Sequence, residues 1–145
     1  MSRTLGGRKL RQAENLSLTS NDIQVTPPCV DATITVGAES TDVRAITIQL
    51  KDATGADINY VEHVRASLFT TSGMTAYATT GGSTGIAIGT DGALLALVNK
   101  KVFILTSESD GDIDLTWTDS GTEPAFLALH LPNGRTIVSA ALTNT

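Results

Sequence analysis

The chain has 145 residues, of which 41% are apolar and 17% charged, about one domain's worth of sequence and enough to bury a substantial core. The net charge of −5 argues against binding nucleic acid through overall charge, and the single cysteine excludes a disulfide framework or a cysteine-rich zinc site. No apolar run approaches the roughly 18 residues of a membrane helix, and the N-terminus lacks the apolar segment of a secretory signal. We therefore expect a product that stays soluble in the cytoplasm, with no nucleic-acid or membrane partner.

The charge is distributed unevenly along the chain. Residues 1–30 have a balance of +2, from Arg3, Arg8, Lys9 and Arg11 against two acidic residues. The rest of the chain has 6 basic and 13 acidic residues, a balance of −7. A basic segment on an acidic body is typical of an interaction tail, and a merely solvated terminus is the alternative.

Residues 1–28 are predicted to form an N-terminal arm, and residues 29–145 a β-sandwich domain. The arm has good helix formers over residues 8–16, although a helix of that length is not stable alone in water. Beyond it, apolar and polar residues alternate as in an extended segment, until Pro27-Pro28 ends the pattern. Such an arm needs a partner surface to order it. The candidate partner-binding residues are Arg3, Leu5, Arg8, Lys9, Leu10, Arg11, Leu16, Leu18, Ile23 and Val25.

From Asp31 onward the apolar pattern has the period of two that is typical of half-buried strands. Residues 43–50 are expected to bury Ile46, Ile48 and Leu50, and the next strand to bury every second residue from Val64. The loop 70–85, rich in Thr, Ser and Gly, is long enough to carry function. Strands are predicted at residues 32–36, 43–50, 60–70, 86–88, 93–98 and 102–105.

Residues 107–143 are predicted to close the fold as an antiparallel meander. Ile113, Leu115 and Trp117 alternate with polar residues, and the dipeptides Asp110-Gly111 and Asn133-Gly134 are strong hairpin signals. Seven to nine short strands with a turn every 8–12 residues indicate a β-sandwich or a barrel.

No motif predicts a catalytic residue, a metal site or a cofactor. Residues 81–85 match G-x-S-x-G around Ser83, but a nucleophile elbow needs a strand before the serine and a helix after it. Asp110, Asp112 and Asp114 lack the glycine and glutamate spacing of a calcium loop and are expected to form a solvated face. His63 and His130 lack a second ligand nearby in the sequence, and Glu62 and Glu123 are not placed across a cleft. His130 is expected at a sheet face with its ring partly buried.

The segments ITIQLKDATGADI, VRASLFT and GIAIGTDGALLALVNKKVFIL resemble a group of small structural proteins of tailed phages. Within the same stretch, SESDGDIDLTWTDSGTEPAFLALHLPNGR is similar to the closing strands of bacterial immunoglobulin-like domains. The resemblance covers about residues 43–143 and leaves the arm outside. Because the chain lacks the inter-sheet disulfide of antibody domains, Trp117 is expected to fill part of the core.

This resemblance implies an all-β protein, an immunoglobulin-like antiparallel β-sandwich of seven to nine strands with an extended N-terminal arm. It also implies a virion component on the capsid surface, made in the host cytoplasm without a signal peptide. Its function would be that of a capsid cement or decoration protein, a homo-oligomer with a trimer favoured, whose arm staples subunits of the major capsid protein. The alternative is a tail or fibre adhesion module that binds host-surface glycan through the 70–85 loop. A hydrolase using Ser83 ranks far behind both.

Overall fold

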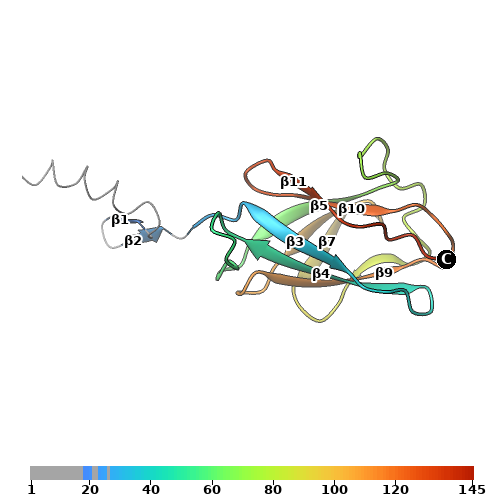
Figure 1. The fold of residues 1–145 in the computed structure, drawn as a ribbon, viewed down its shortest axis with the longest axis horizontal. Coiled ribbons are helices and arrows are strands. Elements are labelled where there is room, and N and C mark those ends of the chain that lie inside the picture. Colours follow the sequence, from blue (N-terminus) through green and yellow to red (C-terminus); the bar gives the residue numbers. More distant parts are fainter. Residues whose placement is uncertain (1–17, 21–22, 26) are drawn as a thin grey trace, which may run out of the picture.

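The computed structural model describes residues 18–20, 23–25 and 27–145, with side chains from residue 27 onward, and this part of the chain is all-β (Figure 1). Strands β3, β4, β9 and β6 form a four-stranded sheet in that order, and β11, β10, β5, β8 and β7 form a five-stranded sheet. The short strands β1 and β2 pair with each other. The strands are β1 (Leu18–Ser20), β2 (Ile23–Val25), β3 (Asp31–Val36), β4 (Val43–Lys51), β5 (His63–Phe69), β6 (Gly85–Ile88), β7 (Ala93–Val98), β8 (Val102–Thr106), β9 (Asp112–Thr118), β10 (Phe126–His130) and β11 (Thr136–Val138).

The strand order matches that of an immunoglobulin-like sandwich except for β7 and β8, which follow β6 in the chain, whereas the C′ and C″ strands of a variable domain precede D. β3, β4, β9 and β6 lie in the A-B-E-D order, and β11, β10 and β5 in the G-F-C order, with β8 and β7 added beyond the C strand. All pairings within the two sheets are antiparallel. The predicted fold class is therefore confirmed. Within the part of the chain that is described, no helix is long and apolar enough to cross a bilayer.

The core follows the alternation that the sequence predicts. Ile46, Ile48 and Leu50 on β4 are fully buried, as are Leu68 on β5 and Trp117 on β9. Full burial of one large aliphatic side chain contributes about 1.5–3 kcal/mol, so these inward rows supply the main stabilisation of the sandwich. Trp117 is fully buried in the core, as predicted.

The predicted meander over residues 107–143 is wrong. β9 pairs with β4 and β6 in the four-stranded sheet, whereas β10 pairs with β5 and β11 in the five-stranded sheet. Asn133-Gly134 does form the turn of the β10–β11 hairpin, but Asp110-Gly111 connects β8 to β9, which lie in different sheets. A turn dipeptide lets the chain reverse, but it does not decide whether the next strand joins the same sheet or the facing sheet about 10 Å away.

The C-terminal residues tie the two sheets together beyond β11. The backbone N–H of Leu142, which is fully buried, donates to Ala125 O at 2.8 Å. The buried side chain of Asn144 donates to Asp42 O and Asp119 O at 2.7 and 2.9 Å, and accepts from Arg44 Nε at 3.0 Å. The last residues therefore belong to the folded body, whose C-terminus lies at one end of the long axis (Figure 1).

The arm is described only in part. Leu18 is paired with Val25 and Ser20 with Ile23, so residues 18–20 and 23–25 form an antiparallel pair where the alternation predicted one extended segment. The predicted helix over residues 8–16 lies outside the described residues. The predicted boundary between residues 28 and 29 stays a prediction.

Gly82 is required by close packing against Trp117. It adopts φ +78°, and a Cβ there would lie 2.8 Å from both Trp117 Cη2 and Thr118 O. Gly81 is also required by close packing, because a Cβ there would lie 2.4 Å from Lys100 O. Two of the three glycines in residues 81–85 are thus explained by packing on the core tryptophan and on the neighbouring turn.

We expect Gly82→Ala to destabilise the fold more than Gly134→Ala. Both residues have positive φ, but a Cβ at Gly134 would meet nothing within 4 Å, so that substitution carries only the left-handed backbone cost of about 1–2 kcal/mol. Gly82→Ala adds steric overlap with the core, a further cost of about 1–3 kcal/mol. Urea unfolding of the two variants measures the difference, and equal losses of stability would contradict the assigned packing.

Candidate functional site

Most of the predicted partner-binding residues fall outside the described residues. These are Arg3, Leu5, Arg8, Lys9, Leu10, Arg11 and Leu16. The other three, Leu18, Ile23 and Val25, lie in the β1–β2 hairpin, where Leu18 and Val25 are cross-strand partners. The structure thus brings two of the predicted arm residues together and leaves their proposed role as a prediction.

The root of the arm is held by hydrogen bonds to the body. Tyr60 Oη donates to Pro27 O at 3.1 Å, and Val30 N–H donates to Lys51 O at 3.0 Å. Between them, Cys29 is buried and its thiol contacts Asp31 O at 3.7 Å. Burial raises the pKa of Cys29, so the thiol stays protonated and serves as a small apolar anchor.

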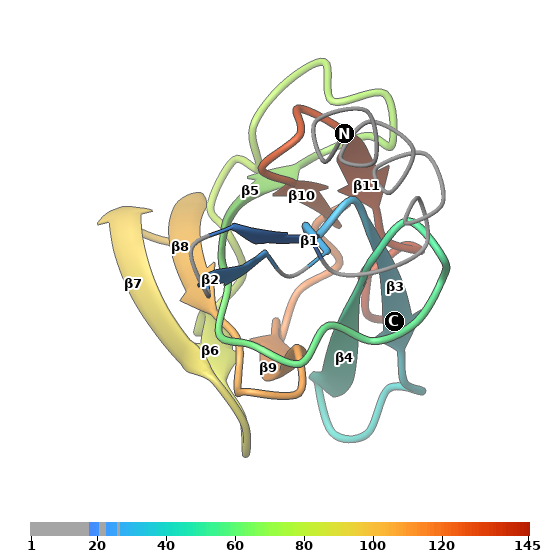
Figure 2. The same ribbon diagram turned by 90° about the vertical axis from the view of Figure 1, so that its left-hand side faces the viewer.

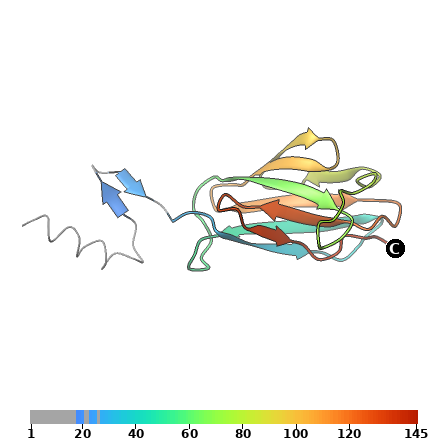
Figure 3. The same cartoon turned by 90° about the horizontal axis from the view of Figure 1, so that it is seen from above.

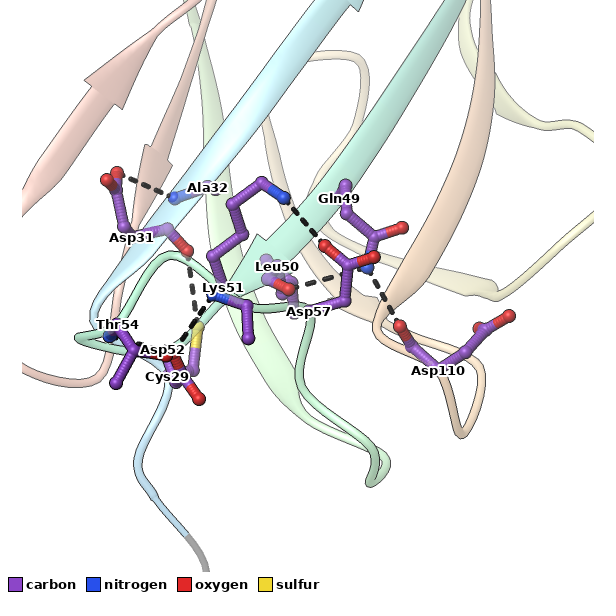
Figure 4. A network of polar contacts seen from close by, with 11 residues as sticks. Cys29, Asp31, Ala32, Gln49, Leu50, Lys51, Asp52, Thr54, Asp57 and Asp110 are labelled. Atoms are coloured by element: carbon purple, nitrogen blue, oxygen red, sulfur yellow. Dashed lines mark hydrogen bonds and ion pairs between the residues drawn. The ribbon is translucent and has the colours of Figure 1, made fainter. Parts of the chain in front are cut away.

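The surface around the arm root is stiffened by turns that side chains cap. Asp52 Oδ1 accepts the backbone N–H of Thr54 at 2.8 Å and the Thr54 hydroxyl at 2.6 Å. The hydrogen bond from the hydroxyl is the main cause that lowers the pKa of Asp52. Lys51 Nζ pairs with Asp57 at 2.6 Å, and Gln49 Nε2 donates to Asp110 O at 2.8 Å. Figure 4 shows these contacts together at the end of the body where the chain arrives from the arm. The arm therefore starts from a fixed position.

Glu123 holds the end of the 70–85 loop. Its carboxylate accepts the backbone N–H groups of Thr80, Gly81 and Gly82 at 2.9, 3.0 and 3.0 Å, together with the Thr80 hydroxyl. Burial alone would raise the pKa of Glu123, but these hydrogen bonds outweigh burial and lower the pKa from 4.5 to about 2. Glu123 is therefore ionised at neutral pH, and it is engaged in holding the loop.

Ser83 lies in a second set of loop contacts centred on Asp119. Ser83 N–H donates to Asp119 Oδ1 at 3.1 Å, and Ser83 Oγ accepts the N–H of Ser120 at 3.0 Å. Lys100 Nζ donates to the carbonyl oxygens of Gly82 and Ser83 at 3.1 and 2.7 Å. The described contacts of Ser83 are therefore those of a residue that fixes a loop.

His130 lies apart from these contacts, on the five-stranded sheet. Its ring, half-buried as predicted, is 3.3 Å from Thr136 Oγ1. Burial, and next the charge of Arg65, lower the pKa of His130, so its ring is neutral at pH 7. No residue is shared between the hydrogen bonds of Ser83 and those of His130.

The 70–85 loop carries one exposed aromatic side chain. Tyr77 is 48% exposed and stacks on Phe69, with ring centroids 4.9 Å apart and planes at 15°. A single antiparallel bridge between Phe69 and Tyr77 joins this loop to the end of β5. The loop therefore presents a supported aromatic face to solvent.

The acidic residues of β9 group differently from the prediction. Asp112 and Asp114 join Asp91, from the turn before β7, with carboxylate oxygens within 4.8 Å of one another, while Asp110 lies near Gln49. Asp91, Asp112 and Asp114 are half-buried. The pKa of Asp112 is raised, first by its burial and then by the negative charges of Asp114 and Asp91. Asp112 Oδ1 has no hydrogen-bond partner among the described residues. The cluster is a concentration of negative charge at the start of β7.

The sequence comparisons assign no family: no protein-family model matches the chain, and no curated protein matches it. The structure also identifies residues that sequence reasoning missed. Glu123 and Asp119 hold one end of the sandwich, and Asn144 and Arg44 fasten its C-terminus. The one local signal was Asp119-Ser120-Gly121, a turn sequence in which an aspartate commonly accepts backbone N–H groups.

We expect Glu123→Gln to destabilise the protein and to remove part of its acid sensitivity. An amide cannot accept every donor that the carboxylate accepts, so the cost is about 1–3 kcal/mol at neutral pH. The folded pKa of about 2 lies below the unfolded value near 4.5. The contribution of the carboxylate is therefore complete above pH 4.5 and is lost as the pH falls toward 2. Urea unfolding between pH 7 and pH 2.5 measures both effects.

Glu108→Gln is the matched control, because Glu108 is exposed and accepts one backbone N–H, that of Gly92, at 3.1 Å. It should change stability by less than about 0.5 kcal/mol. Similar losses of stability in the two variants would show that the hydrogen bonds from Thr80, Gly81 and Gly82 to Glu123 stabilise the fold no more than a single exposed hydrogen bond does.

Proposed function

We propose that the protein is a non-enzymatic structural protein that fastens to a larger assembly through its N-terminal arm, as a capsid cement or decoration protein does on a virion. The observation that carries the proposal is the charge division, +2 over residues 1–30 against −7 over the rest. The resemblance of residues 43–143 to small structural proteins of tailed phages supplies the virion setting. The partner is then the major capsid protein.

The polar chemistry of the body supports a scaffold role. The side chains of Glu123, Asp119 and Asn144 are engaged in hydrogen bonds within the body, and each accepts bonds from or donates bonds to backbone groups. Groups used in this way hold loops and termini in place. The binding energy for a partner must then come from the arm and from exposed surfaces.

Arm binding is assisted by the way the arm leaves the body. Pro27, Cys29 and Val30 are held by the body through hydrogen bonds and burial. An arm that starts from a fixed point searches a smaller volume, which lowers the entropy cost of docking. The basic side chains of the arm pair with acidic groups of the partner, and its alternating apolar residues fill a groove or add to a sheet edge.

Deletion of residues 1–26 tests the proposal. The deletion keeps the bonds of Pro27, Cys29 and Val30, so the body should unfold at an unchanged temperature and lose its attachment to capsids of its virus. Cosedimentation with purified shells measures attachment. Arg65→Ala, which removes an exposed basic group on β5, is the control and should bind normally. Full occupancy of shells by the armless chain would refute the proposal.

A tail or fibre adhesion module is the second candidate, favoured by the exposed Tyr77 on the 70–85 loop. Aromatic rings with one solvent face and a rigid support stack on apolar sugar faces. In this case Tyr77→Ala would lower retention on host-cell glycans about tenfold or more while arm deletion would leave it unchanged. Glycan-array binding of both variants separates the two candidates.

A further inference from the structure

β7 is an edge strand with an exposed apolar surface. It has a strand neighbour, β8, on one side only, and its sequence is ALLALV. Leu95, Leu97 and Val98 are 62%, 54% and 51% exposed. In Figure 2 β7 forms one lateral margin of the body, with β3 on the other side, and in Figure 3 it is the gold strand at the upper margin. A row of unpaired backbone N–H and C=O groups therefore lies beside exposed leucine side chains.

The other edges of the two sheets are less suited to pairing. β6 has four residues and β11 three. β3 has six residues, as β7 has, but it presents Thr33 and Thr35 to solvent. Sheet proteins usually blunt their edges with short strands or charged residues. β7 has neither of these protections, and the one protective feature it carries is a bulge between Ala96 and Val98.

Opposite charges lie at the two ends of β7. Before the strand, Asp91 joins Asp112 and Asp114 in the acidic cluster. After the strand come Lys100 and Lys101. Lys100 is bound to the carbonyl oxygens of Gly82 and Ser83, but Lys101 takes part in none of the ion pairs found among the described residues. One end of the edge is thus acidic and the other end basic.

We propose that β7 pairs antiparallel with β7 of a second copy of this chain, about a two-fold axis near Leu95. The two five-stranded sheets then form one continuous sheet. Antiparallel pairing places the acidic cluster of each copy beside Lys101 of the other, twice per dimer. Parallel pairing would place like charges together, so the charges also fix the direction of the pairing.

The apolar side chains fit the same arrangement. Leu95 is directly opposite Ile104 on β8, so both lie on the outer face of the five-stranded sheet. With the axis near Leu95, the leucines of the two copies become cross-strand neighbours, and Leu97 of each copy lies opposite Ala93 of the other. Apolar cross-strand pairs of this kind stabilise antiparallel sheets. Strand addition and apolar contact therefore coincide.

The occupant is a second copy because the edge is complementary to itself. A two-fold contact requires that the same patch serve both partners. The edge at β7 satisfies this requirement because it has acidic residues at one end, Lys101 at the other end and Leu95 near its centre. The inference does not rest on the proposed function, since it concerns residues 88–114 and not the arm.

The first experiment compares Leu95→Lys with Val61→Lys in sedimentation velocity of the full chain. The wild-type chain should sediment as a dimer. Leu95→Lys should weaken the dimer at least about tenfold, because two lysines would meet on the axis. Val61 is 53% exposed and lies between β4 and β5, so Val61→Lys should leave the dimer unchanged. A monomeric wild-type chain, or a trimer unaffected by Leu95→Lys, overturns the proposal.

The second experiment tests the charges and the register. Asp91→Lys and Lys101→Asp should each weaken the dimer, and a mixture of the two variants should form a heterodimer more readily than either forms a homodimer. Leu95→Cys should give a disulfide-linked dimer under mild oxidation, whereas Val61→Cys should not. The natural Cys29 is 1% exposed and does not compete. Failure of the mixture to associate, or equal crosslinking at both positions, counts against β7 pairing.

Discussion

The end of the sandwich near β6 depends on two carboxylates that accept backbone N–H groups. Glu123 accepts those of residues 80–82, and Asp119 accepts those of Ser83, Gly121 and Glu123. A chain that crosses from one sheet to the other leaves its backbone donors without ladder partners, and such groups need acceptors. With them satisfied, the glycine turn can pack directly on Trp117. The core tryptophan, the glycines and the carboxylates therefore form one interdependent unit.

This unit changes how the charge of the body is interpreted. The formal charge of the chain counts Glu123 and Asp119 as surface acids, but their carboxylates are bound by internal donors. Asp91, Asp112 and Asp114 are different, because their carboxylates face each other. In this cluster Asp114 accepts a hydrogen bond from the Thr47 hydroxyl at 3.1 Å, whereas Asp112 Oδ1 has no hydrogen-bond partner among the described residues. The cluster is thus a concentration of negative charge next to the exposed apolar edge. Charge and apolar surface together mark that side for a protein partner.

The features predicted correctly from the sequence are those that a short stretch of residues determines by itself. Alternation identified Ile46, Ile48 and Leu50 as buried, and the dipeptide Asn133-Gly134 identified the turn of the β10–β11 hairpin. Prediction from the sequence failed where a residue's partner comes from elsewhere in the chain. Residues 119–125 carry the chain to the facing sheet, and no local signal distinguishes this connection from a hairpin. The same holds for Asp91, which reaches Asp112 and Asp114 only because residues 89–91 continue alongside β9. The run ALLALV is typical of a buried strand, and only the sheet order reveals that it lies at an edge.

An arm and a self-complementary edge have different consequences for assembly. A β7 pair uses the exposed edge of both copies, so the contact closes on itself and cannot extend the sheet further. This geometry builds a dimer, whereas the trimer implied by the phage resemblance would need a contact between different patches. A dimer presents two arms on one rigid body. Once the first arm is bound, the second binds from a high effective concentration, and modest affinity of each arm becomes strong attachment when the sites on the partner lie within reach. The β7 contact would then strengthen attachment to the larger assembly although it does not contact that assembly. If the two copies separate, each arm binds only with its single-site affinity.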